Sequence, residues 1–141
     1  MRMPRQLVGA AAVFGLAAAG LAVGAAPASA ATSYNGACGS GYGVIDSMRV
    51  GNGGDGYGTI YLTYNSSNGY NCLVTVRDSG SSASFTAAWL RVSGGSWHKD
   101  EGIYSSYAGP LYVHAANSCV DWGGWVGADS YIKINYNDHC S

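Results

Sequence analysis

The four cysteines are the residues whose number and spacing say most about chemistry. Cys38, Cys72, Cys119 and Cys140 are even in number, and no Cys-x-x-Cys pair of the kind found in zinc ribbons and redox motifs occurs among them. His139 beside Cys140 is the nearest additional metal-type ligand. We therefore expect two disulfides, with no metal site and no cysteine left as a nucleophile.

Catalytic constellations are not evident in the remaining polar residues. Nucleophilic catalysis needs a nucleophile beside a base that a third group orients, and His98, His114 and His139 are the candidate bases. No Gly-x-Ser-x-Gly motif accompanies them. The adjacent acids Asp100 and Glu101 would point to opposite faces of a strand, which does not suit paired carboxylates. We expect no catalytic residues and no cofactor, so the protein is not expected to be an enzyme.

Tryptophan provides the most suggestive binding chemistry. Trp122 and Trp125 flank two glycines, and together with Trp97 and Asp121 they form a candidate ligand platform. Exposed aromatic rings near Asp or Asn side chains can hold sugar rings, because an aromatic ring offers a large apolar surface at low entropic cost. The favoured alternative is that the same indoles fill a small core or cap its ends.

The N-terminus has the features of an export signal. Arg2 and Arg5 precede an apolar run from Leu7 to Ala26, and Ala28-Ser29-Ala30 is a small-x-small cleavage pattern. The run is almost long enough to span a membrane, but its Ala and Gly content and Pro27 favour a cleaved peptide. We expect residues 1–30 to be a signal peptide and residues 31–141 to be one secreted domain.

Removal of the signal peptide changes the charge of the chain. Residues 31–141 keep five basic and all eight acidic residues, a net charge of about −3. Nucleic acids and anionic membrane surfaces bind clustered Lys and Arg, so neither is an expected partner. No second apolar stretch of spanning length follows, so no membrane association is expected after cleavage.

The elements that must position these residues are short strands. Apolar residues alternate with period two throughout, and no segment has a 3.6-residue apolar stripe. Turns are expected at Gly/Asn/Ser-rich segments, including 108–110, 116–117 and Gly123-Gly124. The predicted class is all-β, an antiparallel β-sandwich or barrel of about seven to nine strands with essentially no helix. The clearest strands are expected at 42–50, 59–64, 72–77, 85–92, 97–104, 111–115, 119–122 and 131–136.

Hairpin register favours one of the three possible disulfide pairings. If strands 119–122 and 131–136 pair about a turn near residue 129, Cys119 faces Asn137 or Asp138 and lies within reach of Cys140. Cys38 and Cys72 then form the second bridge, which ties the N-terminal segment to the strand at 72–77. The other two pairings remain open at this point.

Several blocks of sequence resemble the spore-associated protein A family, small secreted proteins of sporulating actinobacteria. The blocks are Tyr34–Tyr42 (YNGACGSGY), Tyr61–Asn65 (YLTYN), Asn71–Arg77 (NCLVTVR), Tyr104–Pro110 (YSSYAGP) and Cys119–Gly124 (CVDWGG). The resemblance implies export, deposition on or near spores and aerial hyphae, and no established enzymatic activity.

The functional prediction is a secreted protein of the spore or hypha surface with a structural or binding role. A carbohydrate- or cell-wall-binding module is the first alternative, and a small secreted hydrolase or enzyme inhibitor is the second. The corresponding partners are cell-wall glycan or other proteins of the spore surface.

Overall fold

The structure is a computed structural model that describes residues 33–52, 54–80 and 82–141. The expected signal peptide, residues 1–30, lies outside these described residues. Within them, no helix has the length and apolar character needed to cross a membrane.

The described residues form eight strands and one short helix, and all strand pairs are antiparallel. The count falls within the expected range, and the only helical element in the described residues is a single 3-10 turn. The elements are β1 (Gly43–Asn52), β2 (Gly56–Asn65), β3 (Tyr70–Arg77), β4 (Ser84–Val92), β5 (His98–Tyr104), β6 (Tyr107–His114), β7 (Val120–Val126), η1 (Asp129–Tyr131) and β8 (Lys133–Asp138).

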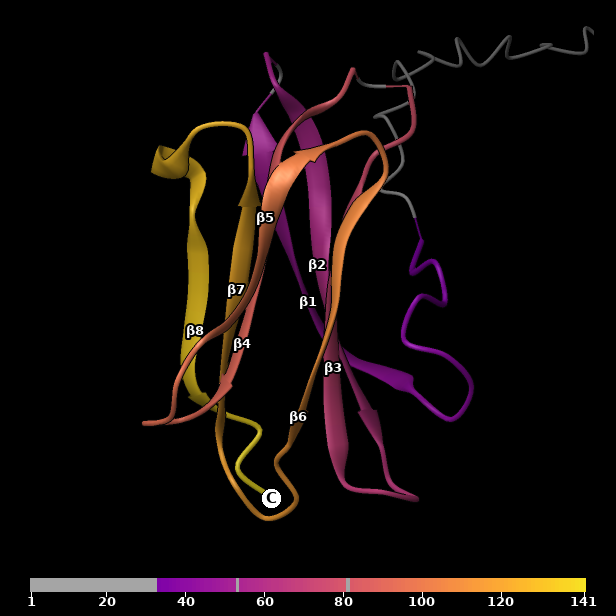
Figure 1. The fold of residues 1–141 in the computed structure, drawn as a ribbon, viewed down its shortest axis with the longest axis vertical. Helices are drawn as coiled ribbons and strands as arrows, with labels where there is room; N and C mark the ends of the chain where they lie inside the picture. Colours follow the sequence, from indigo (N-terminus) through magenta and orange to yellow (C-terminus); the bar gives the residue numbers. More distant parts are fainter. Residues whose placement is uncertain (1–32, 53, 81) are drawn as a thin grey trace, which may run out of the picture.

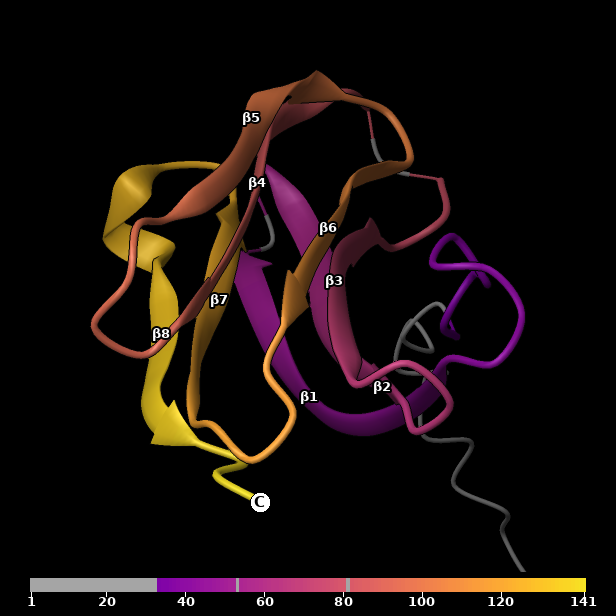
Figure 2. The same ribbon diagram turned by 60° about the horizontal axis from the view of Figure 1, so that its bottom comes forward.

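The strands form two four-stranded sheets with the orders β1-β2-β3-β6 and β5-β4-β7-β8. Figures 1 and 2 show the sheets facing each other, with β1 to β3 on one side and β4, β7 and β8 on the other. The predicted all-β class is confirmed, and the architecture is a sandwich, the first of the two that the sequence allowed.

The two long sides of the sandwich differ. On one side β6 packs against β4 and β5, which belong to the opposite sheet (Figure 2). Asp100 on β5 joins the sheets there, because its carboxylate accepts hydrogen bonds from the backbone N–H of Gly109 at 2.7 Å and from the Tyr104 hydroxyl at 2.5 Å. On the other side β1 contacts β7 and η1, and strands β1 and β8 are the sheet edges.

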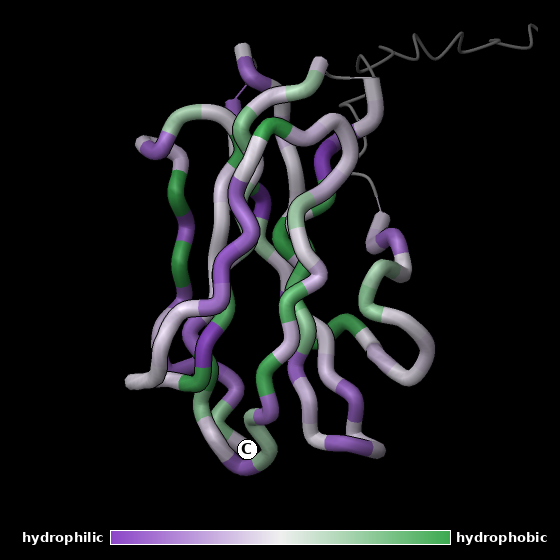
Figure 3. The backbone as a smooth tube through the Cα atoms, in the orientation of Figure 1, coloured by the Kyte–Doolittle hydropathy of each residue, from purple (hydrophilic) through white to green (hydrophobic). Residues whose placement is uncertain are grey.

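The core lies between the sheets, and alternate residues of β2, β4 and β7 contribute most of it, as the period of two predicts. Figure 3 shows an alternation of hydropathy as green and purple bands along the segment that leads into β8, although no residue of β8 itself is buried. The largest side chain of the core is Trp122, which has no exposed surface. The same core cluster contains Ile60, Leu62, Leu73, Leu90 and Val126.

Two predicted turns are wrong, because the glycines concerned lie inside strands. Gly123 and Gly124 are central residues of β7, opposite Trp89 and Ala88 of β4. A Cβ at either position would lie within 2.2 Å of a backbone oxygen of a neighbouring strand, so glycine is present for close strand approach. The segment 108–110 likewise lies within β6, at a register shift opposite β3, and the Gly109–Pro110 peptide is cis.

The segment at 116–117 does turn the chain, but it connects two sheets. β6 pairs with β3 and β7 pairs with β4, so the strands on either side of this turn do not form a hairpin. A period-two pattern identifies strands without identifying their partners, so the turn could be predicted from the sequence but the strands that it connects to could not. The last strand starts at Lys133 because η1 occupies the residues before it.

The cysteines form the disulfides Cys38–Cys72 and Cys119–Cys140, which is the pairing favoured by hairpin register, and none is free. In the C-terminal hairpin, Val120 pairs with Asp138, as the register argument expects. The first bridge fastens the N-terminal segment, which contains no strand among its described residues before Gly43, to the interior strand β3.

Candidate functional site

The most distinctive surface of the protein is the outer face of the sheet β5-β4-β7-β8, which points away from the core. Five aromatic side chains form a continuous row on this face, which we call the aromatic strip. In spatial order its members are Phe85, Trp125, Trp89, Trp97 and Tyr136.

Strand alternation explains why these rings gather. In β4 the buried residues Thr86, Ala88 and Leu90 face the opposite sheet, so Phe85 and Trp89 face outward. In β7 the same rule directs Trp125 outward, and its register partner on β4 is Ala87, which lies between the two outward rings. The small Ala87 leaves room for the indole of Trp125 to lie against both of its neighbours.

The rings of the strip contact each other in sequence across the sheet. The centroid of Trp125 lies 5.2 Å from that of Phe85 in a stacked arrangement and 5.0 Å from that of Trp89 in an edge-to-face arrangement. Trp97 lies 5.7 Å from Trp89 and 6.4 Å from Tyr136. Such pairs are individually worth about 0.5–1.5 kcal/mol beyond their burial, so each ring is held in place by the next.

Part of the strip remains accessible to solvent. Phe85, Trp89 and Trp97 are half-buried, and Tyr136 is 58% exposed. On β5, Ile103 opposite Phe85 is 69% exposed and extends the apolar surface. A contiguous exposed apolar surface on a soluble domain marks a binding surface more often than an isolated apolar residue does.

The charged groups around the strip balance each other. Lys99 Nζ lies 4.1 Å from the ring centroid of Trp89, and the Trp89 indole N–H donates to Glu101 Oε1 at 2.5 Å. Arg91 lies 4.3 Å above Trp97 and forms an ion pair with Asp121 at 2.6 Å. Two cations and two anions therefore flank the strip, which leaves it without a dominant charge.

The indole N–H of Trp125 is a buried donor that has no hydrogen-bond acceptor among the described residues. The whole residue is only 6% exposed. A buried unpaired donor costs about 1–3 kcal/mol, and a native structure keeps one only where another factor compensates for it. It lies within the strip, and an acceptor oxygen of a ligand would reach it only after a local rearrangement of the surrounding side chains.

Asp121 has a structural role at one end of the strip. Its carboxylate is 2% exposed and accepts hydrogen bonds from Arg91 Nε and Ser93 Oγ, both at 2.6 Å, and from the backbone N–H of Asn137 at 2.8 Å. Burial by itself raises the pKa of this carboxyl, but the hydrogen bonds and the Arg91 charge together hold the pKa below its usual value of 3.8. Asp121 therefore positions Arg91 over Trp97 and is not open to a ligand.

We expect Asp121→Asn to reduce the acid sensitivity of the fold. Because the pKa is lower in the folded protein than in the unfolded chain, the carboxylate contributes stability above the unfolded pKa, and this is lost as the pH falls below 3.8 toward the folded value. The variant should lose about 2 kcal/mol at pH 7 and show a flatter decline below pH 4, as measured by urea unfolding at several pH values. Asp129→Asn, at an exposed site on η1, is the control and should match the original protein; equal slopes for Asp121→Asn and the original protein would contradict the prediction.

Trp122 is not part of a ligand platform, and its prediction as one is wrong. The residue is fully buried in the core, and its indole N–H donates to Asp138 Oδ2 at 3.0 Å. Trp122 and Trp125 are three residues apart in one strand, so their side chains point to opposite faces. Of the four predicted platform residues, the structure places Trp97 and Trp125 in the strip, Asp121 beside it and Trp122 behind it.

Sequence reasoning missed three members of the strip, Phe85, Trp89 and Tyr136. The available signal was the alternation within the segment 85–92, which puts Phe85 and Trp89 on one face. Alternation alone does not show which strands pair with this one. It therefore could not show that Trp125 and Trp97 would lie beside Phe85 and Trp89.

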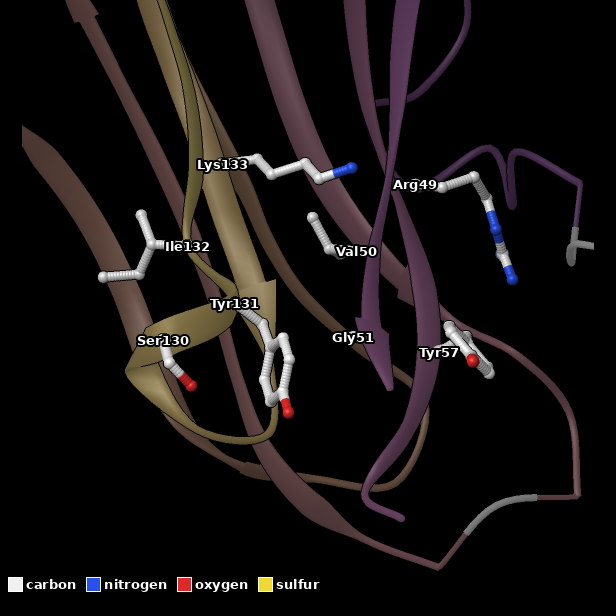
Figure 4. Close-up of a pocket in the computed structure, with 8 residues that line it drawn as sticks. All are labelled: Arg49, Val50, Gly51, Tyr57, Ser130, Tyr131, Ile132 and Lys133. Carbon is white, nitrogen blue, oxygen red and sulfur yellow. The ribbon is translucent and has the colours of Figure 1, made fainter. Parts of the chain in front are cut away.

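A cavity of about 260 Å³ lies elsewhere. It is on the side of the sandwich where the edge strands β1 and β8 lie, which we call the open side. Figure 4 shows Tyr131 and Lys133 on one side of it and Val50 and Gly51 of β1 on the other, with the Lys133 side chain directed toward Val50. Pockets that enclose small molecules typically measure about 300–1,000 Å³, so this cavity is small for a ligand site. The aromatic strip is the better candidate.

Comparison with known proteins gives one informative relationship. No family model matches the chain, and no solved structure matches it. Spore-associated protein A of Streptomyces coelicolor is 46% identical to it over 127 residues, which is 89% of this chain and 79% of that protein. Identity at this level over most of both chains shows that the protein belongs to the spore-associated protein A family.

Proposed function

We propose that the protein is a secreted, non-catalytic binding protein of the spore or hypha surface that holds a cell-wall glycan on its aromatic strip. The observation that carries the proposal is the row of five touching aromatic rings on an outer sheet face. The name of the Streptomyces relative supports the location.

The form of the strip favours an extended ligand. The rings come from three strands of the sheet and one turn: Phe85 and Trp89 lie on β4, Trp125 on β7 and Tyr136 on β8, and Trp97 directly precedes β5. They form a row on a sheet face, so they suit a linear chain that lies along this row. A chain of sugar rings can place apolar ring faces against successive aromatic side chains.

The charges favour a neutral ligand. Arg91 and Lys99 are matched by Asp121 and Glu101, so the strip has no net field that would attract a polyanion or a polycation. A glycan offers hydroxyl and acetamido oxygens, which could accept the unpaired indole N–H of Trp125 after local adjustment. Neutral or N-acetylated polysaccharides are therefore the proposed ligand class.

The test measures retention of the purified, disulfide-bonded protein on insoluble chitin, peptidoglycan and cellulose. We expect saturable retention on at least one of these polymers. Trp97→Ala should weaken it by about tenfold or more, because the substitution removes the ring that joins Trp89 to Tyr136 and the platform beneath Arg91. Tyr136→Ala should weaken it to a smaller degree because Tyr136 is at the end of the row.

Tyr107→Ala is the matched control for Tyr136→Ala. Tyr107 is 41% exposed and lies on β6, in the opposite sheet. Its removal should leave retention unchanged. The proposal fails if none of the three polymers retains the original protein, or if Tyr107→Ala weakens retention as much as Trp97→Ala. Fractionation of a sporulating culture into medium, hyphae and spores tests the surface location separately.

A further inference from the structure

A cluster of three metal-type ligands lies at the open side of the sandwich, away from the aromatic strip. Asp46 belongs to β1, Asp138 ends β8, and His139 follows directly. Asp46 is far in sequence from the adjacent pair Asp138 and His139, and the cluster joins the edge strands β1 and β8 of different sheets. Each is partly exposed, with side-chain exposures between 30% and 39%, so an ion from solvent can reach them.

The two distances from His139 to the carboxylates are close to those in a coordination sphere. His139 Nε2 lies 3.0 Å from Asp46 Oδ2 and 3.5 Å from Asp138 Oδ2, and all three ligand atoms lie within 4.8 Å of one another. Ligands about 2.0–2.1 Å from a tetrahedral Zn²⁺ lie about 3.3–3.4 Å apart, so the two His139 separations bracket the expected value. Small side-chain rotations would bring the three atoms around one ion.

The surroundings of Asp138 orient its carboxylate. Oδ2 accepts the indole N–H of the buried Trp122 at 3.0 Å, and Oδ1 accepts the backbone N–H of His139 at 3.0 Å. Hydrogen bonds of this kind from outside the ligand set fix the orientation of metal-binding carboxylates in known sites. Trp122 thus links the cluster to the core of the sandwich.

The charge of the cluster also favours a cation. In the part of the chain that the structure describes, neither Asp46 nor Asp138 forms an ion pair with Lys or Arg. Their only basic partner is His139, whose imidazole is a metal ligand in its neutral form. A cavity of about 150 Å³ adjoins His139 and offers space for water ligands of a bound ion.

We propose that Asp46, Asp138 and His139 bind one divalent transition-metal ion, of the Zn²⁺ type, which bridges the two sheets at their open side. Imidazole with two carboxylates is a ligand set that such ions accept, and three protein ligands leave at least one position for water. The ion replaces the direct contact between Asp46 and His139 as the link between the edge strands β1 and β8. This site does not depend on the glycan function of the aromatic strip.

The test is titration of the purified, disulfide-bonded protein with ZnCl2, after EDTA treatment and removal of the chelator. We expect one ion to bind per chain, with a rise in the melting temperature on saturation. His139→Gln and Asp46→Asn should each weaken binding by about tenfold or more and abolish the rise in melting temperature. Co²⁺ in place of Zn²⁺ should give visible absorption that is lost in the same variants.

His98→Gln is the control, because His98 is an exposed histidine on β5 of the sandwich. It should bind Zn²⁺ like the original protein. The proposal is overturned if the original protein shows no saturable binding, or if His98→Gln weakens binding as much as His139→Gln. It is also overturned if His139→Gln lowers the metal-free melting temperature while Zn²⁺ has no effect on the original protein, since the cluster would then be only an ion pair.

Discussion

Replacement of Arg77 by methionine is expected to lower the free energy of unfolding by about 3 kcal/mol. Arg77 ends β3 and is only 2% exposed. Its guanidinium donates to the Ser84 hydroxyl, to Thr86 Oγ1 at 3.1 Å and to the backbone oxygen of Ser82 at 2.6 Å. Methionine keeps much of the apolar volume but leaves these acceptors without their donor.

The environment of Arg77 shows why the loss should be large. Burial lowers the pKa of its guanidinium, and the nearby Asp55 charge raises it only in part, so the protein bears the cost of a charge held away from water. That cost is offset by hydrogen bonds that fasten the segment before β4 to the end of β3. Without these hydrogen bonds, the Arg77 side chain no longer holds Ser82, Ser84 and Thr86 to the end of β3.

Urea unfolding followed by tryptophan fluorescence measures the effect of Arg77→Met. Lys99→Met is the control, because it also replaces a cation with methionine but at an exposed site on the outer sheet face. It should change the unfolding free energy by no more than about 0.5–1 kcal/mol. A loss in Arg77→Met no greater than the loss in Lys99→Met would contradict the prediction.

Gly124→Ala is expected to destabilise the protein by about 3 kcal/mol. A Cβ at this position would lie 2.1 Å from the backbone oxygen of Ala87 and 2.8 Å from Thr75 Oγ1. These two atoms are already joined, since the Thr75 hydroxyl donates to Ala87 at 2.8 Å. The added methyl would therefore force β7 away from β4 and break a bond between the two sheets.

Gly43→Ala is the matched control for this substitution. Gly43 is a strand residue like Gly124, but a Cβ there would have no atom within 4 Å. Thermal unfolding should show a large decrease in melting temperature for Gly124→Ala and almost none for Gly43→Ala. Similar melting temperatures for the two variants would show that the strands at Gly124 can move apart at little cost.

The sequence was sufficient for the local features of the fold. Alternation located all eight strands, and the segments rich in Gly, Ser and Asn marked the hairpin turns after β1, β2 and β4. Both signals arise from neighbouring residues: side chains of a strand alternate in direction, and turn residues adopt conformations that others resist. The disulfide pairing followed from the same local register, because Cys119 and Cys140 close one hairpin.

Glycine within strands was where local reasoning failed. Gly123-Gly124 has the composition of a turn, yet both residues lie in β7 because β4 and β8 approach too closely for a side chain. The reason for these glycines is a contact with residues distant in sequence, so no local pattern contains it. The turn predicted at 108–110 is wrong for the same reason, since a Cβ added at Gly109 would lie 2.6 Å from the backbone oxygen of Leu73.

The sequence by itself thus determined export-type features at the N-terminus, strands, turns and cross-links, and through its resemblance the family. Only the tertiary structure decided which face of each strand is buried and which residues from other strands each face contacts. It placed Trp122 in the core and Trp125 in the aromatic strip, and it brought Asp46 beside His139. The physical reason is that alternation fixes the relative direction of side chains within one strand, whereas the pairing of strands and the packing of sheets depend on contacts between distant parts of the chain.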